Sequence, residues 1–511
     1  MMNRMLAAIA LSLLCTATVA ADTTMDALLY VVGEAAPGDE IGVYPVLQVT
    51  GNEPARDVVV TIDLPPGSLF SGQTVPADWA CIADRSTMTC RIASVAPPDF
   101  ISAIEFRAIV GGEILGETSI SLTVTAANAP RVAVVERFFI WRLLTVTNTN
   151  DSGPGSLRDV LERANQLCAP PERCKIAFDV PTPATFEPLT PLPPVTACGQ
   201  LWIDAGATST EAPGQYELSG AKVSSGSGLE VRADCDAGKR LLEIHGLTVN
   251  RFPEDGLRIH PGGTGYSVWL SGVRIGTDTT GNHPRPNAWR GISVTSPVAA
   301  LRLSGSSVST NGRSGVYVWD SRLVEINGSS IIGNGASGIF VNRGAVTGYG
   351  GNTIAHNAHW GIAVVPGASM SLVHNNSIHS NGGPAIDWGL DGQSPQEPAG
   401  GVAPPVVHSA TFNPADGTTT IRGTITVQTV RGARYEVSIY SNAAARPDAE
   451  RWEGRSEMYS IYVPSPGVYP WEAVIRRDLR GRTLTAAAGV GIGDDFPTFT
   501  GSELSLPFTV E

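Results

Sequence analysis

The strongest constraint on the fold is a repeat of 23 to 24 residues in the second half of the chain. Its copies read SVSTNGRSGVYV, SIIGNGASGIFV, TIAHNAHWGIAV and SIHSNGGPAIDW, starting at residues 307, 330, 353 and 377. Within each copy, apolar and polar residues alternate over short runs, which is the periodicity of strands rather than of helices. A strand that buries one row of side chains cannot form a core alone. Each copy must therefore lie on the next, as in a solenoid.

Three short strands in each period predict the coil of a parallel β-helix. A leucine-rich repeat would need a denser leucine pattern than the copies show. Two looser copies, 248–259 and 274–294, extend the array towards the N-terminus. We expect three inward columns, formed by Val308, Ile331, Ile354 and Ile378; by Val316, Ile339, Ile362 and Ile386; and by Leu301, Leu323, Val346 and Met370.

Recurring asparagines and glycines predict the corners of the coil. The asparagines at 311, 334, 357 and 381 are spaced by 23, 23 and 24 residues. Asparagine tolerates the left-handed backbone of a sharp turn, and stacked asparagine side chains can hydrogen-bond from coil to coil. The glycine before each Val or Ile of the second column predicts another corner.

The segment before the repeat carries a family resemblance. Residues 145–158 read TVTNTNDSGPGSLR, and Ser156 can cap a short helix that places Leu157, Val160, Leu161 and Ala164 on one face. This segment, with IAFD at 176–179, LWID at 201–204 and IGTDTTG at 275–281, resembles the start of secreted bacterial right-handed parallel β-helix proteins. The resemblance spans about residues 140–400. It implies an exported right-handed solenoid whose helix shields the open edge, but no particular activity.

Both flanks of the repeat alternate in the manner of strands. Residues 22–128 contain DLPPG at 63–67, WAC at 79–81 and TC at 89–90, and resemble the immunoglobulin-like repeat domains of bacterial surface proteins. Residues 403–511 follow an APP linker, and GSELS at 501–505 resembles the end of a sandwich often attached to such solenoids. We therefore predict an all-β chain: a right-handed parallel β-helix with its N-terminal cap at 140–402, flanked by two β-sandwich modules at 22–128 and 403–511.

Residues 1–21 have the pattern of a secretory signal peptide. Arg4 precedes an apolar run at 6–14, and VAA at 19–21 offers a cleavage site. The run is too short for a membrane span; the alternative is a retained anchor. We expect a secreted, periplasmic or cell-surface protein with no transmembrane segment after removal of the signal.

Six cysteines remain after the signal, and an even number in an exported chain predicts disulfides. Proximity suggests three pairs among the 15 possible pairings. A metal site is the weaker alternative, because no CxxC spacing occurs and no histidine clusters with the cysteines. The suggested pairs are Cys81 with Cys90, Cys168 with Cys174, and Cys198 with Cys235.

Charge and motifs leave two classes of function. A net charge of −13 argues against nucleic acid as a partner. The first class is a surface or secreted protein that binds polysaccharide or acts as an adhesion scaffold. The alternative is a polysaccharide lyase or glycoside hydrolase, which needs carboxylates that converge with each other or with Arg or His in one groove. The paired-Asp signature of polygalacturonases and the Asp-Pro-His signature of uronan epimerases are both missing, which favours the binding protein.

The candidate site residues form two sets. His356 and His379, with Asp387 and Asp391, are candidates for acid–base catalysis or metal binding, and His359 and His374 lie in the same two coils. The alternative is a set of corner and surface polar residues. No cofactor is indicated, although carboxylates could hold calcium. The second set consists of aromatic candidates for stacking on sugar rings, or for packing under a loop or an end module: Tyr317, Trp319, Phe340 and Trp360.

An inserted loop, residues 277–290, interrupts the coil spacing. It carries His283, Arg285 and Arg290. Loops on a rigid solenoid often carry recognition, and an ornament of the fold is the alternative interpretation.

Overall fold

The structure is a computed structural model of the 511-residue chain. Its described residues fall into two compact units, 1–143 and 144–511, which we treat separately. The predicted signal peptide at 1–21 and His374 lie outside the described residues. The structure describes residues 23–33, 35–98, 100–101, 104–112, 115–206, 215–235, 240–262, 265–296, 298, 300–370, 375–392, 403–427, 433–443, 446, 448–456, 461–463, 465–492 and 499–510.

The first unit is a β-sandwich of two antiparallel sheets around one apolar core. Along its strands buried and exposed residues alternate, so each sheet turns one face to the core, which includes Val43, Ile62 and Phe106. One sheet has the order β1 (Thr24–Val32), β2 (Glu40–Thr50), β8 (Glu105–Ile109), β4 (Leu69–Thr74), with β7 (Phe100–Ile101) on β2. The other has the order β10 (Ala129–Ile140), β9 (Gly116–Ala126), β3 (Ala55–Asp63), β6 (Thr87–Val95), β5 (Ala80–Asp84).

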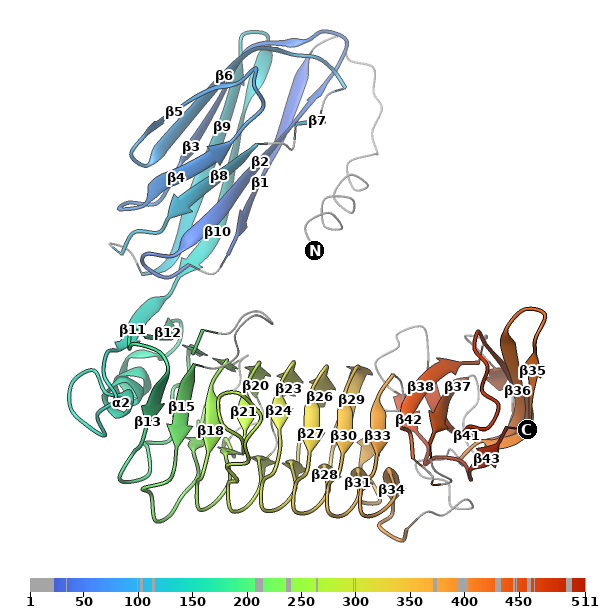
Figure 1. Ribbon diagram of the computed structural model, residues 1–511. Helices are drawn as coiled ribbons and strands as arrows, with labels where there is room; N and C mark the ends of the chain where they lie inside the picture. Colours follow the sequence, from blue (N-terminus) through green and yellow to red (C-terminus); the bar gives the residue numbers. More distant parts are fainter. Residues whose placement is uncertain are drawn as a thin grey trace. The chain divides into compact units, whose positions relative to one another are not determined.

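The second unit contains three long parallel sheets that run along the solenoid. The chain winds from one sheet to the next in each coil, as in a parallel β-helix (Figure 1). Sheet C is formed by β11 (Arg142–Val146), β12 (Arg173–Phe178), β14 (Gln200–Asp204), β17 (Arg240–His245), β20 (Tyr266–Ser271), β23 (Ala300–Ser304), β26 (Val324–Asn327), β29 (Ala345–Gly350) and β32 (Ser369–Met370). Sheet D is formed by β13 (Ala184–Phe186), β15 (Tyr216–Ser219), β18 (Thr248–Asn250), β21 (Arg274–Ile275), β24 (Ser307–Val308), β27 (Ser330–Ile332), β30 (Thr353–Ala355) and β33 (Ser377–His379). Sheet E is formed by β16 (Leu229–Val231), β19 (Leu257–Ile259), β22 (Ile292–Val294), β25 (Val316–Val318), β28 (Ile339–Val341), β31 (Ile362–Val364) and β34 (Ile386–Trp388).

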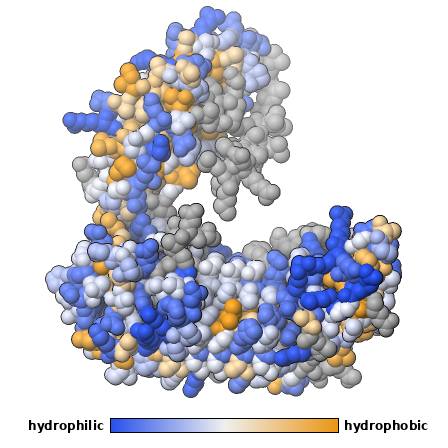
Figure 2. Space-filling view, viewed as in Figure 1, coloured by the Kyte–Doolittle hydropathy of each residue, from blue (hydrophilic) through white to orange (hydrophobic). Residues whose placement is uncertain are grey.

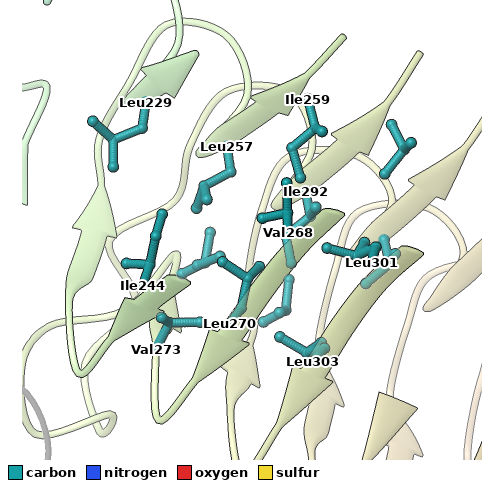
Figure 3. Close-up of a cluster of buried hydrophobic side chains, with 14 of the residues drawn as sticks. Leu229, Ile244, Leu257, Ile259, Val268, Leu270, Val273, Ile292, Leu301 and Leu303 are labelled. Atoms are coloured by element: carbon teal, nitrogen blue, oxygen red, sulfur yellow. The ribbon is translucent and has the colours of Figure 1, made fainter. Parts of the chain in front are cut away.

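The interior of the solenoid is a stack of aliphatic columns. Leucine, isoleucine and valine side chains from successive coils meet between the sheets (Figure 3), while the face seen in Figure 2 is mostly hydrophilic or neutral. The first two predicted columns are correct, since all eight of their members are buried. The third needs one correction: Val324, not Leu323, pairs with Leu301 and points inward. A shift of one residue moves a side chain to the opposite face of a strand.

The predicted asparagine ladder is present between sheets D and E. The Nδ2 of Asn311 donates to Oδ1 of Asn334 at 3.1 Å, and the same bond recurs from Asn334 to Asn357 at 2.9 Å and from Asn357 to Asn381 at 3.0 Å. The left-handed residue is not the asparagine, however. It is the residue before it, for example Thr310 with φ +61°. The asparagines are buried, so hydrogen bonding along the axis explains them, and the turn is made one position earlier.

The glycines that precede the second column are required by close approach rather than by an unusual φ. A Cβ on Gly338 would lie 2.5 Å from Ile354 Cγ2 and 2.8 Å from Asn357 Nδ2. The equivalent position of the last coil is Ala385, next to β34, which ends sheet E. The glycine is therefore needed where a further coil is stacked on the corner.

The N-terminal end of the solenoid is covered by the predicted helix. The helix α2 (Leu157–Leu167) begins at Ser156, whose side chain accepts a hydrogen bond from the Asp159 N–H. Leu157, Val160, Leu161 and Ala164 are buried, as their spacing predicts. None of the described helical residues forms a segment long and apolar enough to cross a membrane.

The three suggested disulfides are confirmed. Cys81 and Cys90 face each other on neighbouring strands β5 and β6. The other two bonds, Cys168–Cys174 and Cys198–Cys235, lie in the first coils of the solenoid beside α2.

The C-terminal part of the second unit is a β-sandwich that continues from the last coil. Its two sheets enclose a core of their own, while Tyr440, Ala449 and Leu504 join the core of the solenoid. One sheet has the order β35 (Val406–Asn413), β36 (Thr418–Val427), β40 (Gly467–Ile475). The other has the order β38 (Arg451–Arg455), β37 (Ala433–Asn442), β41 (Thr483–Ile492), β42 (Phe499–Gly501), with β39 (Ile461–Val463) on β37 and β43 (Phe508–Thr509) on β41.

Candidate functional site

The outer face of sheet E carries the predicted aromatic residues. Each sheet E strand has three residues, and the middle one points away from the core. Strand register places these middle residues in one column along the solenoid. The column runs through Glu230, Arg258, Ser293, Tyr317, Phe340, Ala363 and Asp387.

Three of the rings form what we call the aromatic platform: Tyr317, Trp319 and Phe340. The Tyr317 and Phe340 ring centroids are 5.3 Å apart with an interplanar angle of 14°, and those of Tyr317 and Trp319 are 6.3 Å apart at 20°. The Arg290 guanidinium lies 3.9 Å from the Tyr317 ring centroid. Since Arg290 comes from the preceding coil and Phe340 from the following one, both faces of Tyr317 are covered. Trp319, which is 50% exposed, presents the open ring surface.

Trp360 lies apart from the platform. It precedes Gly361 at the corner before β31, and its ring makes an edge contact with His359, with centroids 5.7 Å apart. Trp360 lies three positions before Ala363, the residue that pairs with Phe340, so it occupies a different position within the coil.

The predicted histidine and aspartate candidates separate into two pairs. His356 and His379 meet edge to face with ring centroids 5.7 Å apart, at the outer side of sheet D. Asp387 belongs to sheet E, and Asp391 follows it in the turn after β34. The four residues therefore do not form one catalytic group.

The aspartates meet a third carboxylate that sequence inspection missed. Each of Asp387, Asp391 and Glu503 offers an oxygen, and these three oxygens lie within 4.8 Å of one another. Burial raises the pKa of Asp387 and the Asp391 carboxylate adds to this rise, while the backbone N–H groups of Gly392, Asp391 and Leu390 oppose it. Glu503 is more than a hundred residues away in sequence, so only the packing of the C-terminal segment against the last coil brings it there.

The inserted loop covers part of sheet D and forms a polar cleft of about 310 Å³. An ion pair between Arg285 and the buried Glu217 anchors the loop to the solenoid. Within the loop, His283 Nδ1 and Asp278 Oδ2 are hydrogen-bonded at 2.7 Å. Burial by itself would raise the pKa of Asp278, but hydrogen bonds from Thr280 and His283 outweigh it and hold the pKa well below its usual range. The cleft is lined by Thr277, Gly281, Asn282, Pro284, Ser307, Ser309, Thr310, Ser330 and Ile332.

A column of hydroxyl groups continues from this cleft along sheet D. Ser307 pairs in register with Ser330, Ser330 with Thr353, and Thr353 with Ser377. The spacing of these hydroxyls by 23, 23 and 24 residues was the signal that could have revealed the column. Its members face outward and are partly exposed, so sheet D presents a regular polar strip.

Comparison with known proteins supports the fold. Residues 227–396 match the family model described as the right-handed β-helix region. Together with the stacked parallel sheets, this match confirms the predicted fold class. No curated protein has a sequence significantly similar to this one.

Similar solved structures are distant. ORF18 of Geobacillus virus E2 is 11% identical, with coverage of 63% of this chain and 78% of that one and a TM-score of 0.24. The enzymatically active domain of tailspike protein 2 from bacteriophage CBA120 is 10% identical, with coverage of 75% and 79% and a TM-score of 0.22. The β-glucuronidase of Parabacteroides merdae is 9% identical, with coverage of 94% and 64% and a TM-score of 0.18. These likenesses carry no functional argument.

Proposed function

We propose that this protein is an exported, surface-exposed solenoid that binds polysaccharide on the aromatic platform of sheet E. The observation that carries the proposal is the half-exposed Trp319 beside the Tyr317–Phe340 stack. A flat, solvent-accessible ring suits the apolar face of a sugar, while polar neighbours suit its hydroxyl groups.

Polar groups that could hydrogen-bond to sugar hydroxyls lie around the platform. Arg290 lies over Tyr317. The Asn342 side chain donates to the Trp319 carbonyl at 3.3 Å, and Asp320, the next residue, pairs with Arg343 at 3.8 Å. The platform thus lies on a rigid strand framework and is bordered by donors and acceptors.

The positions of the acidic residues favour binding over the alternative of a lyase or hydrolase. Glycoside hydrolysis needs two carboxyl groups about 5 to 10 Å apart in one accessible groove. Asp320 pairs with Arg343, the histidine pair lies on sheet D, and Asp387 is fully buried. Asp387 meets Asp391 and Glu503 at the last coil, whereas Asp320 lies three coils earlier and the histidine pair lies on another sheet, so these candidates do not converge in one groove.

The remaining parts of the proposal concern location and the N-terminal unit. Three disulfides fit an oxidising compartment outside the cytoplasm, in agreement with the signal-like sequence at 1–21. We assign the N-terminal sandwich the role of an immunoglobulin-like spacer, and we expect no nucleic-acid partner.

A glycan array followed by calorimetry on the retained polysaccharide tests the proposal. Trp319→Ala should weaken binding by about tenfold or more, because a buried stacking ring at an interface contributes about 1.4 kcal/mol or more. Leu189→Ala, at a residue that is 58% exposed, is the matched control and should bind normally. An array without any retained glycan, or equal affinity of the Trp319 variant, would refute the proposal. Release of unsaturated or shortened sugars by the wild type would favour the enzyme instead.

A further inference from the structure

The last position of the sheet E column differs in chemistry from the three positions directly before it. Tyr317, Phe340 and Ala363 occupy this position in three successive coils, and Asp387 occupies it in the fourth. The Asp387 side chain has no exposed surface. An ionised carboxyl group in such a place is unfavourable unless it is paired, hydrogen-bonded or bound to a metal.

One oxygen of Asp387 has no hydrogen-bond partner. The backbone N–H groups of Gly392, Asp391 and Leu390 stabilise the carboxylate, and the Gly392 N–H donates to Oδ2 at 3.2 Å. Oδ1 is buried without a hydrogen-bond partner. Among the described residues, no lysine or arginine forms an ion pair with Asp387. Leaving a buried acceptor of this kind unsatisfied is unfavourable, and more so when the group is charged.

Two further carboxylates converge on this buried side chain. Asp391 comes from the turn after β34, and Glu503 comes from the segment after β42. The Trp388 N–H donates to Glu503 Oε1 at 2.9 Å, which orients the glutamate towards the last coil. Three carboxylates within 4.8 Å repel one another unless positive charge lies between them.

We propose that Asp387, Asp391 and Glu503 bind a hard divalent cation, with Ca²⁺ as the ion of choice. Calcium takes oxygen ligands at about 2.3–2.6 Å, so oxygens up to about 4.8 Å apart can share one ion. Asp391 is exposed, and its side of the ion is open to water molecules that complete the coordination. The ion joins the last coil of the solenoid to the C-terminal sandwich, so it acts as a staple at the end of the repeat. This site is separate from the aromatic platform and does not depend on glycan binding.

The test uses the full chain after removal of divalent ions with a chelator. Calcium titration by calorimetry should show one site, with a dissociation constant near the 10⁻⁴–10⁻³ M range of extracellular calcium modules, and saturating Ca²⁺ should raise the Tm by several degrees. Asp387→Asn should weaken the binding at least tenfold and remove the rise in Tm. Asp416→Asn changes an exposed acid in the same sandwich and should leave both unchanged.

Terbium luminescence gives a readout that does not depend on stability. Tb³⁺ takes calcium sites, and Trp388 adjoins Asp387, so excitation of tryptophan should produce terbium emission that Ca²⁺ displaces. The emission should be lost in Asp387→Asn and in Glu503→Gln, provided that their circular dichroism matches the wild type. Wild-type protein that shows neither heat nor a Tm change with 10 mM Ca²⁺ would overturn the proposal. An equal calcium response in Asp387→Asn would also overturn it.

Discussion

Asn334 donates its side-chain N–H to Oδ1 of Asn357 in the next coil at 2.9 Å, and its own Oδ1 accepts the equivalent bond from the previous coil. Each asparagine inside the ladder therefore has hydrogen-bond partners in both the preceding and the following coil. Both amides are buried, so no water is available to replace a lost partner.

We first predict that Asn334→Ala destabilises the solenoid more than Asn381→Ala does. The internal change removes bonds to two coils and leaves buried groups unsatisfied, at a cost of about 2–4 kcal/mol. Asn381 accepts from Asn357 and donates to the Ile354 carbonyl, with no later asparagine to receive a bond. Urea unfolding followed by circular dichroism measures both losses. Equal losses would show that the ladder is not the source of the stability.

Second, Gly338→Ala should reduce stability by about 2–3 kcal/mol, because the new methyl group overlaps the adjacent coil and overpacking carries a cost of this size. The matched change is Ala385→Gly at the last coil, which should lose only about 0.5–1 kcal/mol through chain entropy. The same unfolding experiment compares the two. A Gly338 variant as stable as the wild type would mean that the coils separate to admit a Cβ.

Third, the double change Cys198→Ala and Cys235→Ala should reduce stability by about 3–4 kcal/mol in the chain-entropy account of disulfides. The bond spans 37 residues, so its removal frees a long loop in the unfolded chain. Thermal unfolding without reductant measures the loss, and Thr196→Ala, an exposed neighbour, serves as the control. A loss below 1 kcal/mol would contradict the prediction.

Fourth, the stabilising effect of Asp278 should disappear in acid. Its pKa is lower in the folded protein than in the unfolded chain, so its contribution is complete above the unfolded value near 4 and is lost as the pH falls through the folded value. The Tm of Asp278→Asn should lie several degrees below that of the wild type at pH 7, and this gap should narrow below pH 4. A gap that stays constant down to pH 2 would exclude a role for the charge.

Much of the solenoid could be predicted because its determinants are local and repeated. The spacing of Ile339 and Ile362 predicted their pairing, and Ser156 predicted the start of the helix. The sequence predicted Leu323 as the inward residue, one position before the observed Val324. The segment before β26 carries no asparagine or glycine that would fix the register. The left-handed turn was assigned to the asparagine rather than to the residue before it, because the turn residue and the buried asparagine are adjacent in sequence, as Thr310 and Asn311 are.

The candidate site could be predicted only in part. Register placed Tyr317 and Phe340 in contact, because residues one repeat apart become neighbours. The position of Arg290 over Tyr317 depends on the path of the inserted loop, which has no repeat to guide it. The contribution of Glu503 depends on how the C-terminal segment folds back, and no local pattern encodes that return.

The return of the chain has a consequence for assembly. Ile378 in β33 exchanges backbone hydrogen bonds of 2.7 Å with Ala449, and Ser377 donates to the Glu450 carbonyl. The final rung of sheet D is thus already occupied by the protein's own backbone. A stack of parallel rungs could otherwise recruit another molecule and grow into a filament, and this self-pairing terminates growth so that the number of coils is set by each chain alone.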